Sequence, residues 1–277
     1  MKNLKIIVVF IIIIAGVGIY KYLNSGWDGQ NDIRMAIVTP KEIGMVIISP
    51  ERKMVSTLKI DQQVKIWIPG GMGWYQSNRF KRIVEQENLG SRVADVFFYN
   101  FGFLVNNIIY LDTLDDWRDD RVLWGQLGGL GGIIKYKMLS DKLIYKEDVV
   151  SSELVSSEGN LDEIMGRDFA DNRLLNDEFR MSIINTTSES GLANFIGNRL
   201  GWAGFSVVAI ENSSDLVENC MLVFGPEAEI SYTGQKIKNI FDCQIKKDSG
   251  LGSREIELYL GQKMASVINY PSYVGTF

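Results

Sequence analysis

The stretch EIELYLG, residues 255–261, alternates strictly between apolar residues and residues that suit water. Ile256, Leu258 and Leu260 share one side of an extended chain, and the polar or amphipathic residues between them share the other. This period of two predicts a strand with one buried face.

Apolar stretches upstream predict the other strands of the same domain: MSIIN (181–185), FSVVAI (205–210), which reads as a buried strand, and CMLVFG (220–225). Apolar residues at helical spacing lie between these strands: Leu192, Phe195, Ile196 and Leu200, and then Ile237, Ile240 and Phe241. Strands that alternate with helices predict a small two-layer α/β domain over 179–266, followed by a tail, 267–277.

The region 34–178 also reads as an α/β domain with a mixed sheet, joined to the second domain near 171–177. The expected strands are 34–38, 44–49, 53–60, 64–68 and 108–112. The expected helices are 79–87, 91–103 and one that Asn160 caps. Between 115 and 145 we expect a helix, a break at GGLGG (128–132), and then a strand.

The N-terminus carries an unbroken apolar run, 6–20, between Lys5 and Lys21. A bilayer-crossing helix needs about 20 residues, and flanking lysines can reach the headgroups, so we expect residues 4–23 to contact the lipid bilayer. The interpretation is a signal anchor over 1–23 and a polar tether over 24–33, in a single-pass protein of the cell membrane. The N-terminal lysines place the N-terminus in the cytoplasm and both domains outside. The alternatives are a cleaved signal peptide and, less favoured, a buried core helix.

Composition excludes several kinds of chemistry. The 277 residues contain no His, which removes Ser-His-Asp and Cys-His nucleophile pairs and imidazole metal sites. The 29 basic and 34 acidic residues give a net charge of −5, and no basic patch is visible, so no nucleic-acid partner is expected.

The second domain resembles a known family. The residues that carry the resemblance are IINTTSESGLANFIGNRLGWAGFSVV (183–208), LVFGP (222–226) and LYLG (258–261). They resemble the C-terminal domain of the LytR-CpsA-Psr proteins of bacterial cell envelopes. The region 45–80 is similar, more weakly, to the catalytic domain of that family, in which a Pro-Arg-Asp segment and further arginines are implied to hold a polyprenyl pyrophosphate and its metal ion.

This chain departs from the family where that segment would stand, because it reads Lys59-Ile60-Asp61-Gln62-Gln63. Guanidinium groups are well suited to bind pyrophosphate, and this segment has none. No catalytic, cofactor-binding or metal-binding residue is therefore carried over. Weak candidates for an anionic ligand remain, namely Arg79, Arg82 and Arg52.

Other clusters favour ordinary structural roles. The acidic cluster from Asp112 to Asp120 reads as a solvated helix start rather than a metal site. The glycines at 70–73 and 128–132 read as turns rather than phosphate loops. An aromatic sugar platform formed by Trp67, Trp74, Tyr75 and Phe80 is less favoured than a half-buried loop. Cys220 and Cys243 are expected to be small buried apolar residues, and a disulfide between them is the less favoured alternative.

The expected function is that of a membrane-anchored envelope protein with a degenerate, non-catalytic first domain, which binds cell-wall glycan or envelope proteins without a cofactor. The alternative is a diverged phosphotransferase that moves glycopolymer from a polyprenyl pyrophosphate carrier to the cell wall with Mg²⁺.

Overall fold

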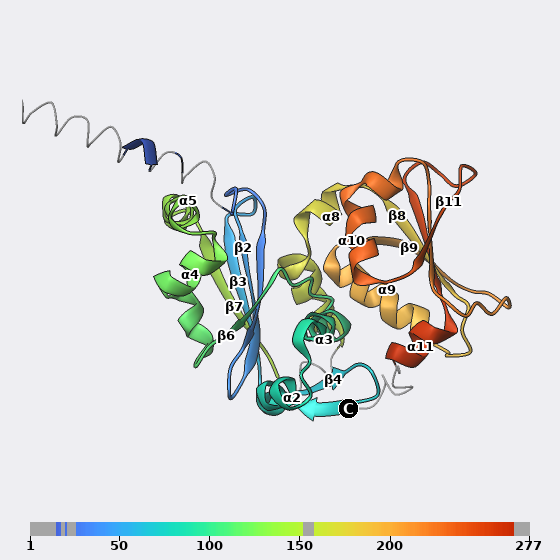
Figure 1. The fold of residues 1–277 in the computed structure, drawn as a ribbon, viewed down its shortest axis with the longest axis horizontal. Helices are drawn as coiled ribbons and strands as arrows, with labels where there is room; N and C mark the ends of the chain where they lie inside the picture. Colours follow the sequence, from blue (N-terminus) through green and yellow to red (C-terminus); the bar gives the residue numbers. More distant parts are fainter. Residues whose placement is uncertain (1–14, 18–19, 21–25, 152–157, 269–277) are drawn as a thin grey trace, which may run out of the picture.

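The computed structural model describes residues 15–17, 20, 26–151 and 158–268, which form two α/β units (Figure 1). Each unit is built on a five-stranded mixed sheet, which confirms the predicted α/β class. Of the predicted anchor, residues 15–17 and 20 are helical and exposed, and the remainder lies outside the described residues. Within the described ranges, no helix combines the length and the apolar character needed to cross a membrane.

The first sheet has the strand order β6-β1-β2-β3-β7. The chain runs antiparallel through β1, β2 and β3, while β6 pairs parallel to β1 and β7 pairs parallel to β3. The strand bounds are β1 Ile33–Val38, β2 Ile43–Ser49, β3 Met54–Ile60, β6 Asn107–Tyr110 and β7 Ile144–Val150. Every residue of β1 and β2 is buried, because helices cover both faces, and this explains why both strands are apolar apart from Arg34 and Ser49.

One face of this sheet packs on Trp117, Leu123 and Ile133, and the other packs on Phe80 and Phe97. The first face is covered by η3 Leu114–Arg118, α4 Asp120–Gln126 and α5 Leu130–Ser140. The second is covered by α2 Phe80–Gln86, α3 Val93–Phe101, α7 Glu158–Ile164 and the π-helical turn η4 Met165–Phe169. A short ribbon with flanking 3-10 turns precedes α2 and α3: β4 Lys65–Ile68, β5 Gly73–Gln76, η1 Ser77–Arg79 and η2 Gly90–Arg92.

The second sheet has the strand order β11-β10-β12-β8-β9. Its strands are β8 Arg180–Asn185, β9 Ser206–Asn212, β10 Met221–Phe224, β11 Gln244–Lys247 and β12 Glu255–Leu260. Its helices are α8 Asn172–Asn176, α9 Leu192–Ala203, η5 Ala228–Ile230, α10 Tyr232–Ile240 and α11 Gln262–Ile268. The inward side chains of β12 are buried and the outward ones half-buried, as the alternation of EIELYLG predicts.

The two units share a core. Helices α3, α9 and α10 lie between the two sheets (Figure 1), and Phe98 of α3 meets Phe241 at a ring-centroid distance of 5.9 Å. Tyr99 stacks on Phe195 at 6.4 Å, and Trp67 is buried in the cluster that fills the second unit. The join predicted from the sequence is therefore a packed interface.

Three expectations are corrected. FSVVAI is an edge strand rather than a buried one: Val208 is 55% and Ile210 is 41% exposed because β9 has a neighbour on one side only. Gly131 and Gly132 lie within α5, so the break is confined to Gly128 and Gly129, whose φ angles are positive. The predicted tether also extends too far, because Trp27 is buried among the side chains beneath α5.

Candidate functional site

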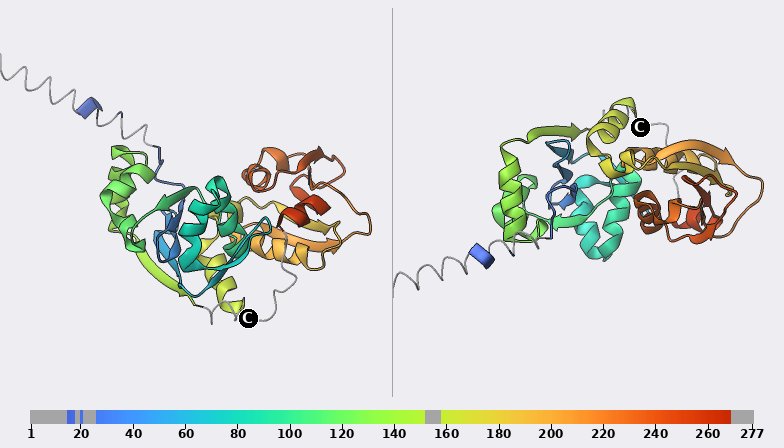
Figure 2. Two further views of the ribbon diagram at one scale, coloured as in Figure 1. Left: turned by 60° about the horizontal axis from the view of Figure 1, so that its bottom comes forward. Right: turned by 90° about the horizontal axis from the view of Figure 1, so that it is seen from above.

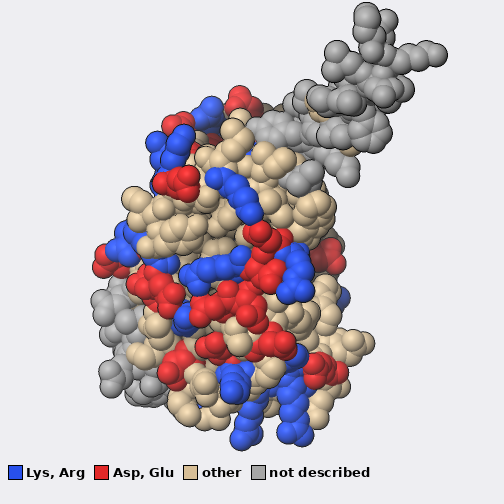
Figure 3. Space-filling view, turned by 90° about the vertical axis from the view of Figure 1, so that its left-hand side faces the viewer, with Lys and Arg blue, Asp and Glu red and all other residues tan. Residues whose placement is uncertain are grey.

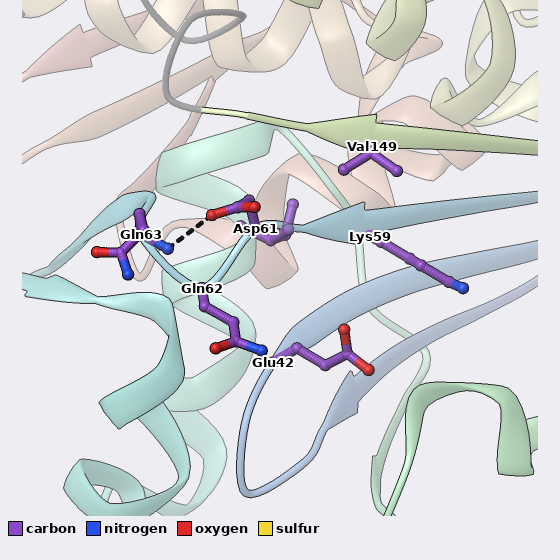
Figure 4. Close-up of a pocket in the computed structure, with 7 residues that line it drawn as sticks. Glu42, Lys59, Asp61, Gln62, Gln63 and Val149 are labelled. Atoms are coloured by element: carbon purple, nitrogen blue, oxygen red, sulfur yellow. Dashed lines mark hydrogen bonds between the residues drawn. The ribbon is translucent and has the colours of Figure 1, made fainter.

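A polar pocket of about 280 Å³ lies at the end of β3, at the segment 59–63 (Figure 4). Its lining combines hydrogen-bonding side chains with two apolar ones: Glu42, Lys59, Ile60, Asp61, Gln62, Gln63 and Val149. Ligand pockets typically measure about 300–1,000 Å³, so this one is the size for a single small polar group such as one sugar ring.

A turn at the end of β3 gives the pocket its shape. Oδ1 of Asp61 accepts a hydrogen bond of 2.8 Å from the backbone N–H of Gln63, and the Asp61 carbonyl accepts one of 2.6 Å from the Ser77 hydroxyl. Aspartate commonly makes such turns with its own backbone. The regular alternation of β3 stops here, and the side chains of Lys59 and Asp61 point away from each other (Figure 4). The two residues therefore do not form a joint site for an anion.

Carboxylates already neutralise the ammonium group of Lys59. Its Nζ lies 2.9 Å from Glu147 Oε1 and 3.6 Å from Asp115 Oδ2, and Arg118 binds the same Asp115 at 2.7 Å. The hydrogen bond to Glu147 is the main cause that raises the pKa of Lys59. Charged side chains of both signs form a band across this side of the molecule (Figure 3). The pocket consequently presents little unpaired positive charge.

By contrast, Glu42 and Gln62 keep their polar atoms available. Within the described residues, neither side chain has a hydrogen-bond partner, and both line the pocket. Figure 4 shows the Gln62 side chain extending toward Glu42, whose carboxylate points to the side of Lys59. A carboxylate accepts hydrogen bonds, and an amide both donates and accepts them. This pair suits a neutral ligand that is rich in hydroxyl or amide groups.

The structure does not bring Arg52, Arg79 and Arg82 together. Arg79 ends η1 and Arg82 lies in α2, both exposed. Arg52 precedes β3, so the seven-residue strand, roughly 23 Å long, separates it from the pocket. Arg52 binds Asp32 at 3.5 Å and donates to the carbonyls of Arg167 and Ala170.

The acidic cluster serves as helix starts, as predicted. Asp116 and Thr113 form a capping box for η3, and Asp119 caps α4 through the backbone N–H of Arg121. Hydrogen bonds from Arg121 lower the pKa of Asp119. Three members, Asp112, Asp116 and Asp119, line a second, open pocket of about 580 Å³. Within the described ranges, no group of three acidic or cysteine side chains is arranged to hold a metal ion.

The aromatic platform is not formed. Trp67 and Phe80 are core residues, and of the four aromatic residues Trp74 alone reaches 38% exposure. The glycine loop beside it is a tight turn, in which Gly70 and Gly73 have positive φ angles and Arg92 donates a 2.8 Å hydrogen bond to the Pro69 carbonyl. The less favoured sugar-stacking interpretation therefore has no geometric support here.

Cys220 and Cys243 form a disulfide, which corrects the expectation that both are free. They directly precede β10 and β11, which pair parallel from Met221 and Gln244 onward, so their Cα atoms come within 4.8 Å. The one signal that could have shown this was the placement of each cysteine immediately before a strand.

Sequence reasoning also missed Arg34, which is 1% exposed in β1. Its Nε donates to the Leu104 carbonyl at 2.8 Å and its Nη2 to the Phe169 carbonyl at 2.6 Å, so it joins β1 to two distant segments. Burial lowers its pKa, and the nearby carboxylates of Asp171 and Asp32 oppose that shift. A charged residue inside an otherwise apolar strand was the available signal.

No family model and no curated protein matches the chain. A crystal structure of the Lin1025 protein from Listeria innocua matches at 14% identity, over 70% of this chain and 86% of that chain, with a TM-score of 0.24. At that TM-score we draw no conclusion from the likeness.

Proposed function

We propose that this chain is a membrane-anchored, extracytoplasmic protein of a bacterial cell envelope that binds a cell-wall glycan at the pocket beside Gln62 and does not catalyse a reaction. One observation carries the proposal. The pocket lies where the family resemblance would put the arginine-containing segment, and it offers Glu42, Asp61, Gln62 and Gln63 in place of guanidinium groups. Hydroxyl-rich ligands suit such a lining, whereas pyrophosphate does not.

The disulfide between Cys220 and Cys243 supports the extracytoplasmic location. Stable disulfides form in oxidising compartments outside the cytoplasm and are rare within it. The apolar run 6–20 is the proposed anchor, and it lies almost entirely outside the described residues.

The test is a titration of the full chain, in detergent micelles, with soluble glycan strands prepared from peptidoglycan. We expect saturable binding that Gln62→Ala weakens, because the loss of one hydrogen bond, about 1 kcal/mol, raises Kd about fivefold. Gln86→Ala is the matched control, since Gln86 is an exposed glutamine at the end of α2. Equal binding by the two variants would exclude the pocket as the glycan site.

The phosphotransferase alternative has its own test. We expect no saturable binding when the same preparation is titrated with geranylgeranyl pyrophosphate and Mg²⁺. Saturable binding that Arg79→Ala and Arg82→Ala abolish would overturn the non-catalytic proposal in favour of the enzyme.

A further inference from the structure

Three exposed apolar side chains lie on the outer surface of the α4–α5 pair. Trp124 of α4 is 47% exposed, and Ile134 and Met138 of α5 are 37% and 65% exposed. Ile134 and Met138 are four residues apart and therefore share one face of the helix, and the Trp124 indole lies beside Gly129 at the turn into α5. We call these three residues the α4–α5 patch. Figure 3 shows a largely uncharged area on this side of the molecule, above the charged band.

The chain enters the folded unit directly beneath α5. A Cβ on Gly128 would collide with the backbone of Gly26, so the two glycines pack backbone to backbone. Lys135 of α5 donates a 3.0 Å hydrogen bond to the Trp27 carbonyl, and Trp27 is buried in the core that also contains Ile133. The entry point of the chain is therefore fixed to α5.

The distance from the apolar run to this entry point is short. The run ends at Tyr20, and residues 21–25 separate it from Gly26. A chain extends by at most about 3.6 Å per residue, so these steps span about 20 Å at most, whatever their conformation. If residues 4–23 cross the bilayer, Gly26 and the start of α5 that packs on it must lie within that distance of the lipid surface.

From these observations we infer that the α4–α5 patch rests on the surface of the lipid bilayer beside the anchor. The inference rests on the proposed membrane anchoring and adds the surface that faces the lipid. Trp is enriched at membrane interfaces, and apolar helix faces there lie about 5–10 Å into the boundary between headgroups and acyl chains. The described N-terminal helical residues, 15–17, lie on the α4–α5 side of the molecule in Figures 1 and 2.

The test measures membrane contact at single positions of the full chain in phosphatidylcholine–phosphatidylglycerol vesicles. A nitroxide is attached at Met138→Cys, or at Leu216→Cys as the matched control. Leu216 follows β9 in the second unit and has the same exposure as Met138, 65%. We expect label 138 to collide several-fold less with an aqueous nickel complex, and more with oxygen, than label 216 does. Equal accessibility of the two labels would overturn the inference.

A third label, at Ile12→Cys in the apolar run, separates this inference from the proposed anchoring. If label 12 is embedded in lipid while labels 138 and 216 behave alike, the anchor stands and the surface contact is wrong. If label 12 is accessible to the aqueous complex, both the anchoring and the surface contact are wrong.

Discussion

The phenolic hydroxyl of Tyr232, at the start of α10, donates a hydrogen bond of 2.8 Å to Oδ2 of Asp171. Asp171 is 3% exposed, its other carboxylate oxygen caps α8, and its backbone N–H donates to the carbonyl of Ala203 at the end of α9. Asp171 thus joins three helices where the two units meet, α8 and α10 through its side chain and α9 through its backbone, so loss of its bond to Tyr232 should be visible in the stability of the whole chain.

We expect Tyr232→Phe to lower the free energy of unfolding by about 2 kcal/mol, because it removes a hydrogen bond to a buried charged group. Tyr259→Phe is the control: it removes a bond of the same length, to Glu257, from a half-buried sheet face, and should cost less. Urea denaturation monitored by circular dichroism measures both. A loss no larger for Tyr232→Phe than for Tyr259→Phe would contradict the role assigned to the junction.

Asp168 should make stability depend on acid pH. Burial alone raises the pKa of Asp168, but hydrogen bonds from Arg167 and Lys146 outweigh it and hold the pKa below its ordinary value of 3.8. A depressed carboxyl pKa stabilises the fold above the ordinary value, and that contribution is lost as the pH falls through the folded-state pKa.

We therefore expect Asp168→Asn to destabilise the chain at neutral pH by about 1 kcal/mol, a modest value because both partners are partly exposed. The difference between wild type and variant should shrink below pH 3.8, the ordinary carboxyl value. Denaturation midpoints measured across the acid range provide the check. A difference that does not change with pH would mean that the charge of Asp168 plays no part.

Reduction of the disulfide should destabilise the second unit. The bond closes a loop with a sequence separation of 23 residues, for which chain entropy predicts about 3 kcal/mol. Thermal unfolding with and without reductant measures the effect. The double variant Cys220→Ala, Cys243→Ala is the control, because the reductant should leave its midpoint unchanged. If reductant lowers both midpoints equally, the bond is not the cause.

Gly102 should be intolerant of a side chain. Its φ angle is +61°, and a Cβ there would lie 2.7 Å from the Cβ of Trp202 and collide with the Arg199 carbonyl. Gly102→Ala should cost about 2–4 kcal/mol, the sum of left-handed strain and overpacking. Gly90→Ala has a similar φ of +52° but meets open space, so it reports the strain alone. Equal losses in urea denaturation would show that the contact with α9 does not matter.

Local patterns in the sequence predicted most of the strands and helices. The strand β12 could be predicted from the sequence, because the alternation of its apolar and polar residues depends only on which face of the strand is buried. The exposure of β9 could not, since it depends on the place of β9 at the edge of the sheet, which is set by the order of the strands. The partnership of Cys220 and Cys243 depends on the parallel register of β10 and β11, which the intervening helix α10 allows and no local pattern marks.

The candidate site was located from the sequence only in part. The segment Lys59–Gln63 was singled out, and it does line a pocket. The contribution of Glu42 was missed because β2 and β3 place it there by antiparallel pairing, Ile43 opposite Ile60, and no motif marks it. The carboxylates that neutralise Lys59 were also missed, since they come from η3 and β7.

The aromatic contacts between the units mean that neither unit has a complete core of its own. Phe98, Trp67 and Leu104 belong to the first unit by sequence, yet they complete the core of the second. A polypeptide that starts at residue 179 would expose that apolar surface to water, and one that stops at residue 178 would leave the matching face of α3 uncovered. Recombination or domain grafting would therefore have to move the two units together. The two units should also unfold together, in a single cooperative transition.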